Sequence, residues 1–133
     1  MSRDRAILIT NSDFARLRRL TSHPSLAAEL GKAVVVDSRR IPPDVVTMNS
    51  RVRFEDQSTG TIRDVTVVFP NEVEASQGRV SVLAPIGTAL LGLSVGQSIR
   101  WPFPDGSTRS LRVLKLIHQP EVGEIGASDI QRE

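Results

Sequence analysis

Hydrophobic and polar positions follow a helical spacing over the first forty residues. Apolar side chains recur at threes and then at fours, at Phe14, Leu17, Leu20, Leu26, Leu30 and Val34. This spacing is typical of amphipathic helices. Pro24 suits the first turn of a second helix because its missing N–H is unpaired there in any helix. Two helices joined by so short a connection must lie antiparallel, so we predict a helical hairpin.

The limits of this hairpin are less well defined by the pattern. Residues 6–10 fit either a short strand or the entry to the first helix. The second helix is expected from Pro24 to about Asp37, which gives roughly 20 Å of helix. Val34–Val36 are β-branched, however, and leave the end of that helix open. Two prolines at 42 and 43 close the segment, because proline does not continue a helix.

After residue 43 the pattern changes to a period of two. Val52 and Phe54 alternate with the charged residues Arg51, Arg53 and Glu55, which indicates a strand with one buried face. Further strands are expected at 62–69, 79–83, 99–101 and 111–117.

A short helix is expected at 85–91, between the third and fourth of these strands. The fold class is therefore α+β: an antiparallel sheet of about five strands with one short helix, preceded by the hairpin. We divide the chain into a hairpin arm at 1–43, a body at 44–120 and a flexible tail at 121–133.

Composition narrows the classes of function. The 133 residues are 39% hydrophobic and 24% charged, as in globular domains, and contain no Cys, which excludes disulfides and thiol chemistry. No segment suits a signal peptide or a membrane-spanning helix, so we expect a cytoplasmic protein that does not bind membranes. Nothing in the sequence indicates an oligomeric state.

Charge is unevenly distributed along the chain. Residues 1–40 hold eight basic and four acidic side chains, although the net charge of the whole chain is only +2. The basic residues singled out in this arm are Arg16, Arg18, Arg19, Arg39 and Arg40. They suit either an acidic partner or a nucleic-acid backbone, and a plain solvated helix face is an equally good interpretation.

Residues that could perform catalysis are scarce. Neither His23 nor His118 has a second ligand at metal spacing, and the glycines do not form a phosphate loop. We therefore predict no enzyme activity, no metal and no cofactor. Arg51 and Arg53 share one strand face and could touch phosphate, although a polar outer face is the more ordinary interpretation.

The uncharged segment 82–97 suggests a binding surface instead. Its leucines are expected in the core, whereas Pro85, Ile86 and Gly87 at the start of the short helix are expected to be exposed to a partner.

Two motifs in this body resemble a known family. Residues 81–99, SVLAPIGTALLGLSVGQSI, resemble the C-terminal domain of the bacterial transcript-cleavage factors of the Gre family. In this comparison Ala84-Pro85 stands at the family's Ser-Pro and Val95-Gly96-Gln97 at its Val-Gly-Asp. The stretch DVVTMNSRVRF at 44–54 resembles the branch called regulator of nucleoside diphosphate kinase.

This resemblance implies an FKBP-like body and a partner, RNA polymerase, bound beside its secondary channel. The docking role would fall on Ala84, Pro85, Ile86 and Gly87. Leu83 and Ala84 replace an acidic residue and a serine of the family pattern, and both changes remove hydrogen-bonding capacity. A prolyl-isomerase activity, which other FKBP-like proteins have, is not expected because the chain has no Tyr and a single Trp.

The predicted hairpin tip departs from the family in a further way. Cleavage factors of this family have a long hairpin with acidic residues at its tip that help hold a catalytic magnesium ion. Here the tip consists of Ser22, His23, Pro24 and Ser25 and holds no carboxylate. The resemblance therefore implies a regulator that competes with cleavage factors but does not cleave. The alternative from another class is a nucleic-acid-binding protein that uses the basic arm.

Overall fold

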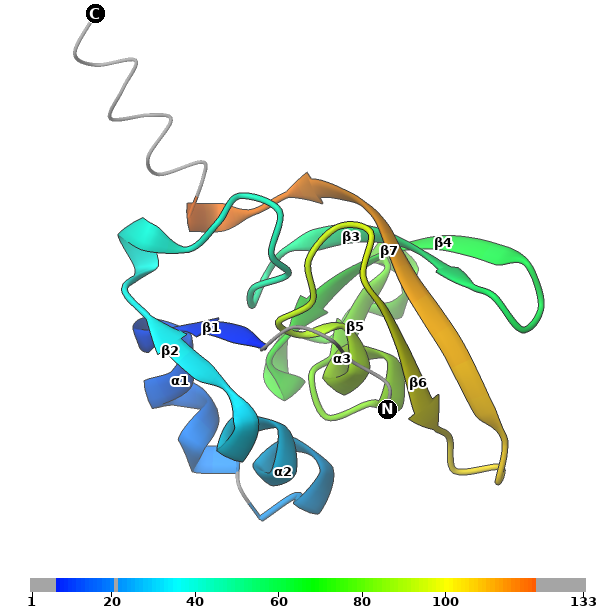
Figure 1. Ribbon diagram of the computed structural model, residues 1–133. Helices are drawn as coiled ribbons and strands as arrows, with labels where there is room; N and C mark the ends of the chain where they lie inside the picture. Colours follow the sequence, from blue (N-terminus) through cyan, green and yellow to red (C-terminus); the bar gives the residue numbers. More distant parts are fainter. Residues whose placement is uncertain (1–6, 21, 122–133) are drawn as a thin grey trace, which may run out of the picture.

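A computed structural model describes residues 7–20 and 22–121, and its elements are shown in Figure 1. The N-terminal unit contains two strands as well as two helices. Its elements are β1 (Leu8–Thr10), α1 (Asn11–Leu17), the 3-10 helix η1 (Arg18–Leu20), α2 (Pro24–Lys32) and β2 (Val34–Val36). A second 3-10 helix, η2 (Ser38–Arg40), leads out of the unit.

The second helix is shorter than expected. It ends at Lys32, so its extension to Asp37 is wrong, and its nine residues give a helix of about 14 Å. β2 pairs in parallel with β1, and the Val34 N–H donates to the Ile7 carbonyl at 2.8 Å. Three β-branched residues in a row favour a strand once a partner strand lies beside them. Of the two interpretations of residues 6–10, the strand is correct for Leu8–Thr10.

Helix α1 is capped by Thr10. Asn11, Ser12 and Asp13, which are residue types often found at N-caps, lie inside the helix instead. The Thr10 Oγ1 accepts a hydrogen bond from the Asp13 N–H at 3.0 Å. This leaves the Asp13 carboxylate free to turn toward the body of the protein.

The body contains a curled sheet of five strands. These are β3 (Arg51–Asp56), β4 (Thr61–Val68), β5 (Arg79–Ser81), β6 (Ser98–Pro102) and β7 (Thr108–His118), in the order β5-β4-β3-β7-β6. Neighbouring strands are antiparallel except for β4 and β5, which are parallel. The 3-10 helices η3 (Pro70–Glu72) and η4 (Ala75–Gln77) allow that parallel connection.

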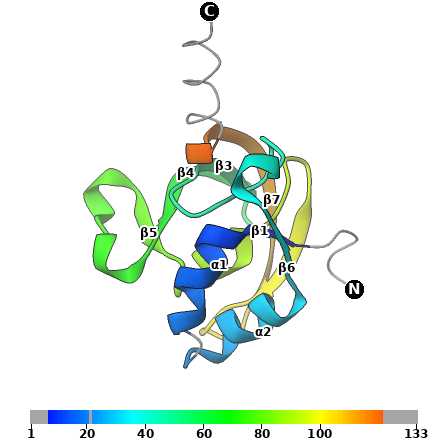
Figure 2. The same cartoon turned by 90° about the vertical axis from the view of Figure 1, so that its left-hand side faces the viewer.

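The short helix α3 (Pro85–Leu90) lies between β5 and β6 in sequence, which confirms the α+β prediction for the body. Figures 1 and 2 show α1 and α2 packed beside α3 on one side of the curled sheet. Of the helices in the described part of the chain, none of these three lies on the opposite, outer side of the sheet.

One hydrophobic core joins the N-terminal unit to the body. Ile7, Leu17 and Leu26 belong to the same buried cluster as Phe54 and Leu90. The N-terminal unit therefore packs on the body and shares its core. Apolar faces of short helices are stable in water only when covered, and here α3 and the sheet cover them.

A close backbone approach fixes β1 against the body. Gly92 has a φ of 84°, and a Cβ at this position would lie 1.8 Å from Cγ2 of Ile7. The Leu8 N–H also points to the Gly92 carbonyl, at 3.4 Å. Only glycine permits this contact, because any side chain would displace Ile7 from the core.

The motif at 44–54 forms the junction between the two parts. Thr47 and Ser50 bond to each other through a hydroxyl contact of 2.8 Å, and Asn49 adopts a φ of 67° in the tight turn between them. The Met48 N–H, presented by this turn, donates to Oδ2 of Asp13 at 3.1 Å. The motif is thus a structural turn that ties α1 to the first long strand.

Two absences apply to the part of the chain that the structure describes. No helix within residues 7–20 and 22–121 is long and apolar enough to cross a membrane. Over those same residues, no three His, Cys, Asp or Glu side chains come together in a way that could hold a metal ion.

Candidate functional site

The candidate docking site is the junction of the β5–α3 connection with the start of α3. We call it the 84–86 loop; it comprises the N-cap Ala84 and the first two helical residues, Pro85 and Ile86. Ala84 is the N-cap of α3 in an extended conformation, as the following proline requires, and Pro85 is the first helical residue. The Ala84 N–H donates to the Ser81 carbonyl at 3.0 Å. The loop backbone is therefore fixed before any partner arrives.

Thr88 fixes the other side of the same loop. Its hydroxyl donates to the Val82 carbonyl and lies 3.1 Å from the Ala84 carbonyl. Because Thr88 is buried, these contacts satisfy backbone groups that water does not reach.

Gly87 is buried, so the expectation that it is exposed is wrong. A Cβ at this position would lie 2.1 Å from the Ser81 carbonyl oxygen, so the first turn of α3 packs directly on the end of β5. Gly87 therefore determines how closely the start of α3 packs on β5, but it exposes no surface to a partner. The leucines that follow, Leu90, Leu91 and Leu93, are buried as expected.

The 84–86 loop is half-buried and borders a shallow hollow of about 280 Å³. Its lining consists of Ser25, Leu83, Pro85, Thr88, Trp101, Pro102, Phe103 and Pro104. It contains no charged residue but presents polar as well as apolar atoms, so it suits an uncharged side chain of a partner. Ser25 lines this hollow together with Pro85, so the predicted hairpin tip lies beside the docking loop. The sequence prediction had placed the tip and the loop in separate domains.

Ile86 faces a second hollow, of about 180 Å³, on the other side of the loop. Arg109 lies in this hollow, 3.5 Å from Oδ2 of Asp56, and its guanidinium stacks 4.5 Å from the centre of the Phe103 ring. The loop is thus an uncharged ridge between a hollow without charged residues and a hollow that contains them.

The expected hairpin tip lies on the surface. Ser22, His23, Pro24 and Ser25 are all exposed. His23 is the N-cap of α2 but makes no side-chain cap bond. Thr21, which also falls in this tip, lies outside the described residues, as does the predicted tail after Glu121.

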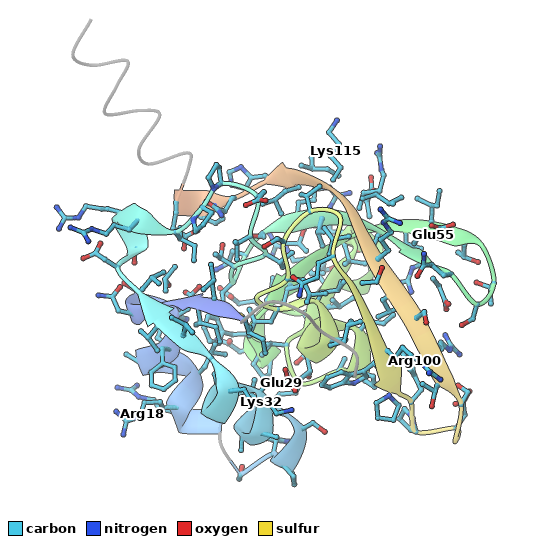
Figure 3. All side chains as sticks on the ribbon, viewed as in Figure 1. Arg18, Glu29, Lys32, Glu55, Arg100 and Lys115 are labelled. Carbon is cyan, nitrogen blue, oxygen red and sulfur yellow. The ribbon has the colours of Figure 1, made fainter. Side chains whose placement is uncertain are left out.

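The five arginines of the predicted basic arm do not form one patch. Arg39 and Arg40 follow β2 near the start of α1, where Asn11 bonds to Ser38. Arg18 lies at the other end of α1 (Figure 3) together with Arg19.

Two of these arginines are also engaged within the protein. Arg16 stacks 3.8 Å from the centre of the Phe69 ring, and Arg39 pairs with Asp37 at 3.4 Å. The arm thus offers two small basic groups to a partner.

Asp13 is a buried carboxylate that the sequence pattern did not single out. It is 9% exposed, and burial raises its pKa to about 6 even though the Met48 N–H bond favours the charged form. The nearby Glu121 carboxylate, which accepts a hydrogen bond from the Thr47 hydroxyl at 2.7 Å, adds to this rise. A buried carboxylate at this junction could not be found from sequence because its partner is a backbone N–H.

The architecture and these motifs define a family. Residues 41–118 match the family model described as "Transcription elongation factor, GreA/GreB, C-term". Since the match covers more than half of the 133 residues, the chain belongs to the GreA/GreB C-terminal family.

Individual relatives narrow the position of the chain within that family. It is 43% identical over 124 residues to the "Regulator of nucleoside diphosphate kinase" of Escherichia coli strain K12, covering 86% of this chain and 91% of the relative. It is 32% identical over 95 residues to "Transcription elongation factor GreA" of Solidesulfovibrio magneticus, covering 71% of this chain but only 58% of the relative.

A similar solved structure supports the same family. "Prokaryotic transcription elongation factor GreA/GreB from Nitrosomonas europaea" is 42% identical, with a TM-score of 0.69 and coverage of 86% of this chain and all of that chain. The resemblance drawn from the two motifs is therefore confirmed, including the branch. The protein is a transcription-related member of the Gre family whose chain spans little more than half of that GreA relative.

Proposed function

We propose that this protein regulates transcription by binding RNA polymerase at the rim of its secondary channel through the 84–86 loop. The observation that carries this proposal is the hydrogen-bonded, uncharged ridge beside an uncharged hollow, in a domain of the GreA/GreB C-terminal family. A preorganised apolar loop loses little conformational entropy on binding, which favours such a contact. The curled sheet with α3 beneath it is consistent with the FKBP-like fold that the family implies.

Several features support regulation without transcript cleavage. Residues 22–25 hold no carboxylate that could bind magnesium. α2 is only nine residues long, and Leu26 within it packs into the core of the body. A unit held in this way occupies the mouth of a channel but does not extend far into it. Competition with longer cleavage factors is therefore the simplest mechanism.

The alternative function, nucleic-acid binding through the basic arm, is less well supported. It requires Arg16, Arg18, Arg19, Arg39 and Arg40 to act together, but Arg16 and Arg39 already have partners within the protein. The relative's name mentions nucleoside diphosphate kinase, and we propose that any influence of this protein on such a kinase is indirect.

The test is a pull-down of purified RNA polymerase core enzyme by the wild-type protein and by Pro85→Asp. We expect Pro85→Asp to lose binding at least tenfold because it places a charge at the centre of the apolar ridge. Pro43→Asp is the matched control, since Pro43 is an exposed proline in the loop before β3 and outside the ridge. Thermal unfolding of both variants serves as the check that each of them keeps the fold.

The outcomes separate clearly. Loss of binding in Pro85→Asp with normal binding in Pro43→Asp supports the proposal, and wild-type inhibition of cleavage stimulated by a GreA factor supports competition. An absence of wild-type binding at moderate salt, or equal binding by both variants, would overturn docking through this loop.

A further inference from the structure

The outer face of the sheet gathers basic side chains that lie far apart in sequence. On β3, Val52 and Phe54 are buried, while Arg51 and Arg53 point to the opposite side. Side chains at paired positions of neighbouring strands share a face. The register therefore places on this outer face Arg51, Arg53, Arg79, Arg100, Arg112 and Lys115. The same strands contribute only two carboxylates to it, Glu55 and Asp64.

Among the residues that the structure describes, most of these cations have no ion-pair partner. Arg53 is the exception, because its guanidinium binds both carboxylate oxygens of Asp64 at 2.8 and 3.1 Å. Within residues 7–20 and 22–121, no ion pair involves the four remaining outer cations on β5, β6 and β7, which are Arg79, Arg100, Arg112 and Lys115. Figure 3 shows Lys115 directed away from the protein.

The pKa of Asp64, the carboxylate that pairs with Arg53, reflects the positive charges around it. The hydrogen bond from Arg53 lowers the pKa of Asp64, and the charges of Arg53, Arg51 and Lys115 lower it further. These cations come from two different strands, so their fields overlap at one place on the face. Such clustering attracts anions with several charges in a row.

The dimensions of the face suit an extended, regularly charged polymer. Five strands at about 4.8 Å spacing place β5 and β6 roughly 19 Å apart across the sheet. The outer cations are also spread along the strands, since Arg79 lies level with His118 of β7 and Arg100 lies level with Ser110. DNA grooves are about 6 and 12 Å wide, so this span reaches phosphates on both sides of a groove.

Aromatic residues are missing from the outer face. The four Phe and the one Trp of the chain are all buried or packed against the core. Single-stranded nucleic acids are usually bound by stacking their bases on aromatic rings. A duplex needs no such stacking, since its phosphates are already held in place.

We propose that the outer face of the sheet binds the phosphate backbone of double-stranded DNA, without reading its sequence, through Arg79, Arg100, Arg112 and Lys115. This function goes beyond polymerase docking and uses a different surface, since the 84–86 loop lies on the α3 side of the sheet. It also differs from binding through the basic arm, whose arginines lie on α1, η1 and η2.

The experiment measures fluorescence anisotropy of a labelled 20-base-pair DNA duplex with the full chain at 50 to 200 mM salt. Four phosphate contacts predict a slope of about −3.6 in log affinity against log salt, so the affinity falls about 150-fold over this range. The double variant Arg100→Glu with Arg112→Glu is expected to weaken binding at least tenfold at 50 mM salt and to reduce the slope by about 2.

The matched control is Arg18→Glu with Arg19→Glu, which makes the same change in charge at two exposed arginines of η1. It is expected to bind within threefold of the wild type. If the Arg100 and Arg112 charge reversals unfold the protein, as circular dichroism would show, Arg100→Gln with Arg112→Gln takes their place. The polymerase pull-down on the same variants separates this proposal from the first, because all of them keep Pro85.

Three results would overturn the proposal. One is normal DNA binding by the sheet variant with loss in the η1 variant, which would assign binding to the arm. Another is tighter binding of a 20-nucleotide single-stranded RNA than of the duplex. The third is an absence of wild-type binding to the duplex at 50 mM salt.

Discussion

At the scale of single residues, Asp13 shows how one buried carboxylate joins two parts of a chain. Its own N–H bonds to the Thr10 hydroxyl and so completes the start of α1, while its Oδ2 accepts from the Met48 N–H across the junction. Burial makes its charged form costly, and the neighbouring Glu121 increases that cost. The residue therefore makes the junction sensitive to pH.

The pKa of Asp13 is raised from 3.8 to about 6 in the folded protein, and this determines whether stability rises or falls with pH. The folded state binds more protons than the unfolded state between these values, so stability falls as pH rises from about 4 to 6. We expect Asp13→Asn, which can still accept from Met48, to lack this fall. Its stability relative to wild type should increase over that window by as much as about 3 kcal/mol and then level off.

Urea unfolding of both proteins at pH 4.5 and pH 7.5 tests this expectation. Glu121→Gln serves as an intermediate case, since it removes one cause of the raised pKa but leaves Asp13 buried. A stability difference between Asp13→Asn and wild type that is the same at both pH values would contradict the assignment.

At the scale of elements, local pattern was enough wherever one face of an element is buried. The alternation around Val52 and Phe54 predicted β3, and the proline at 85 with apolar residues after it predicted α3. The pattern failed at β2, because Val34 and Val35 are 45% and 42% exposed and so carry no burial signal. What determines β2 is a parallel partner 26 positions earlier, as in the pair Leu8 and Val34, and local periodicity does not contain that information.

If Val34–Val36 form a strand, replacing Val34 and Val35 by alanine should change the free energy of unfolding in the opposite direction from that expected if they form a helix. We expect Val34→Ala with Val35→Ala to lower the free energy of unfolding by about 1 kcal/mol, because alanine is poorer than valine in a strand. In a helix the same change would raise it, because alanine is the best helix former. Chemical denaturation followed by circular dichroism gives the sign.

Val34→Thr with Val35→Thr is the control for that measurement. Threonine keeps the β-branch on two largely exposed side chains, so its stability should stay within about 0.5 kcal/mol of wild type. A gain of stability in the alanine variant would contradict the assignment of Val34–Val36 as a strand.

At the scale of the whole molecule, the N-terminal unit and the body share one core. Composition and motifs predicted the family, the body and its uncharged loop. They did not predict this shared core, because its key contacts join residues far apart, such as Ile7 with Gly92. The outer basic face was visible in sequence only as the pair Arg51 and Arg53. Its remaining members come from strands whose register the sequence does not state.

A single core predicts a single unfolding event. The fluorescence of Trp101, the only Trp, reports on the hollow beside the 84–86 loop, whereas far-ultraviolet circular dichroism reports on all helices and strands. We expect the two signals to give coincident urea transitions, as two-state unfolding requires. Separate midpoints would show that the N-terminal unit unfolds on its own.

The contact between β1 and Gly92 also bears on how the chain is made. Ile7 is synthesised early, yet the glycine against which it packs follows only after β3, β4 and β5 have been made. The first strand to be translated therefore cannot reach its final position before residue 92 has been added. Until then the apolar residues of β1, α1 and α2 remain uncovered in the growing chain. Exposed apolar surface favours aggregation, so the risk of aggregation is greatest during synthesis.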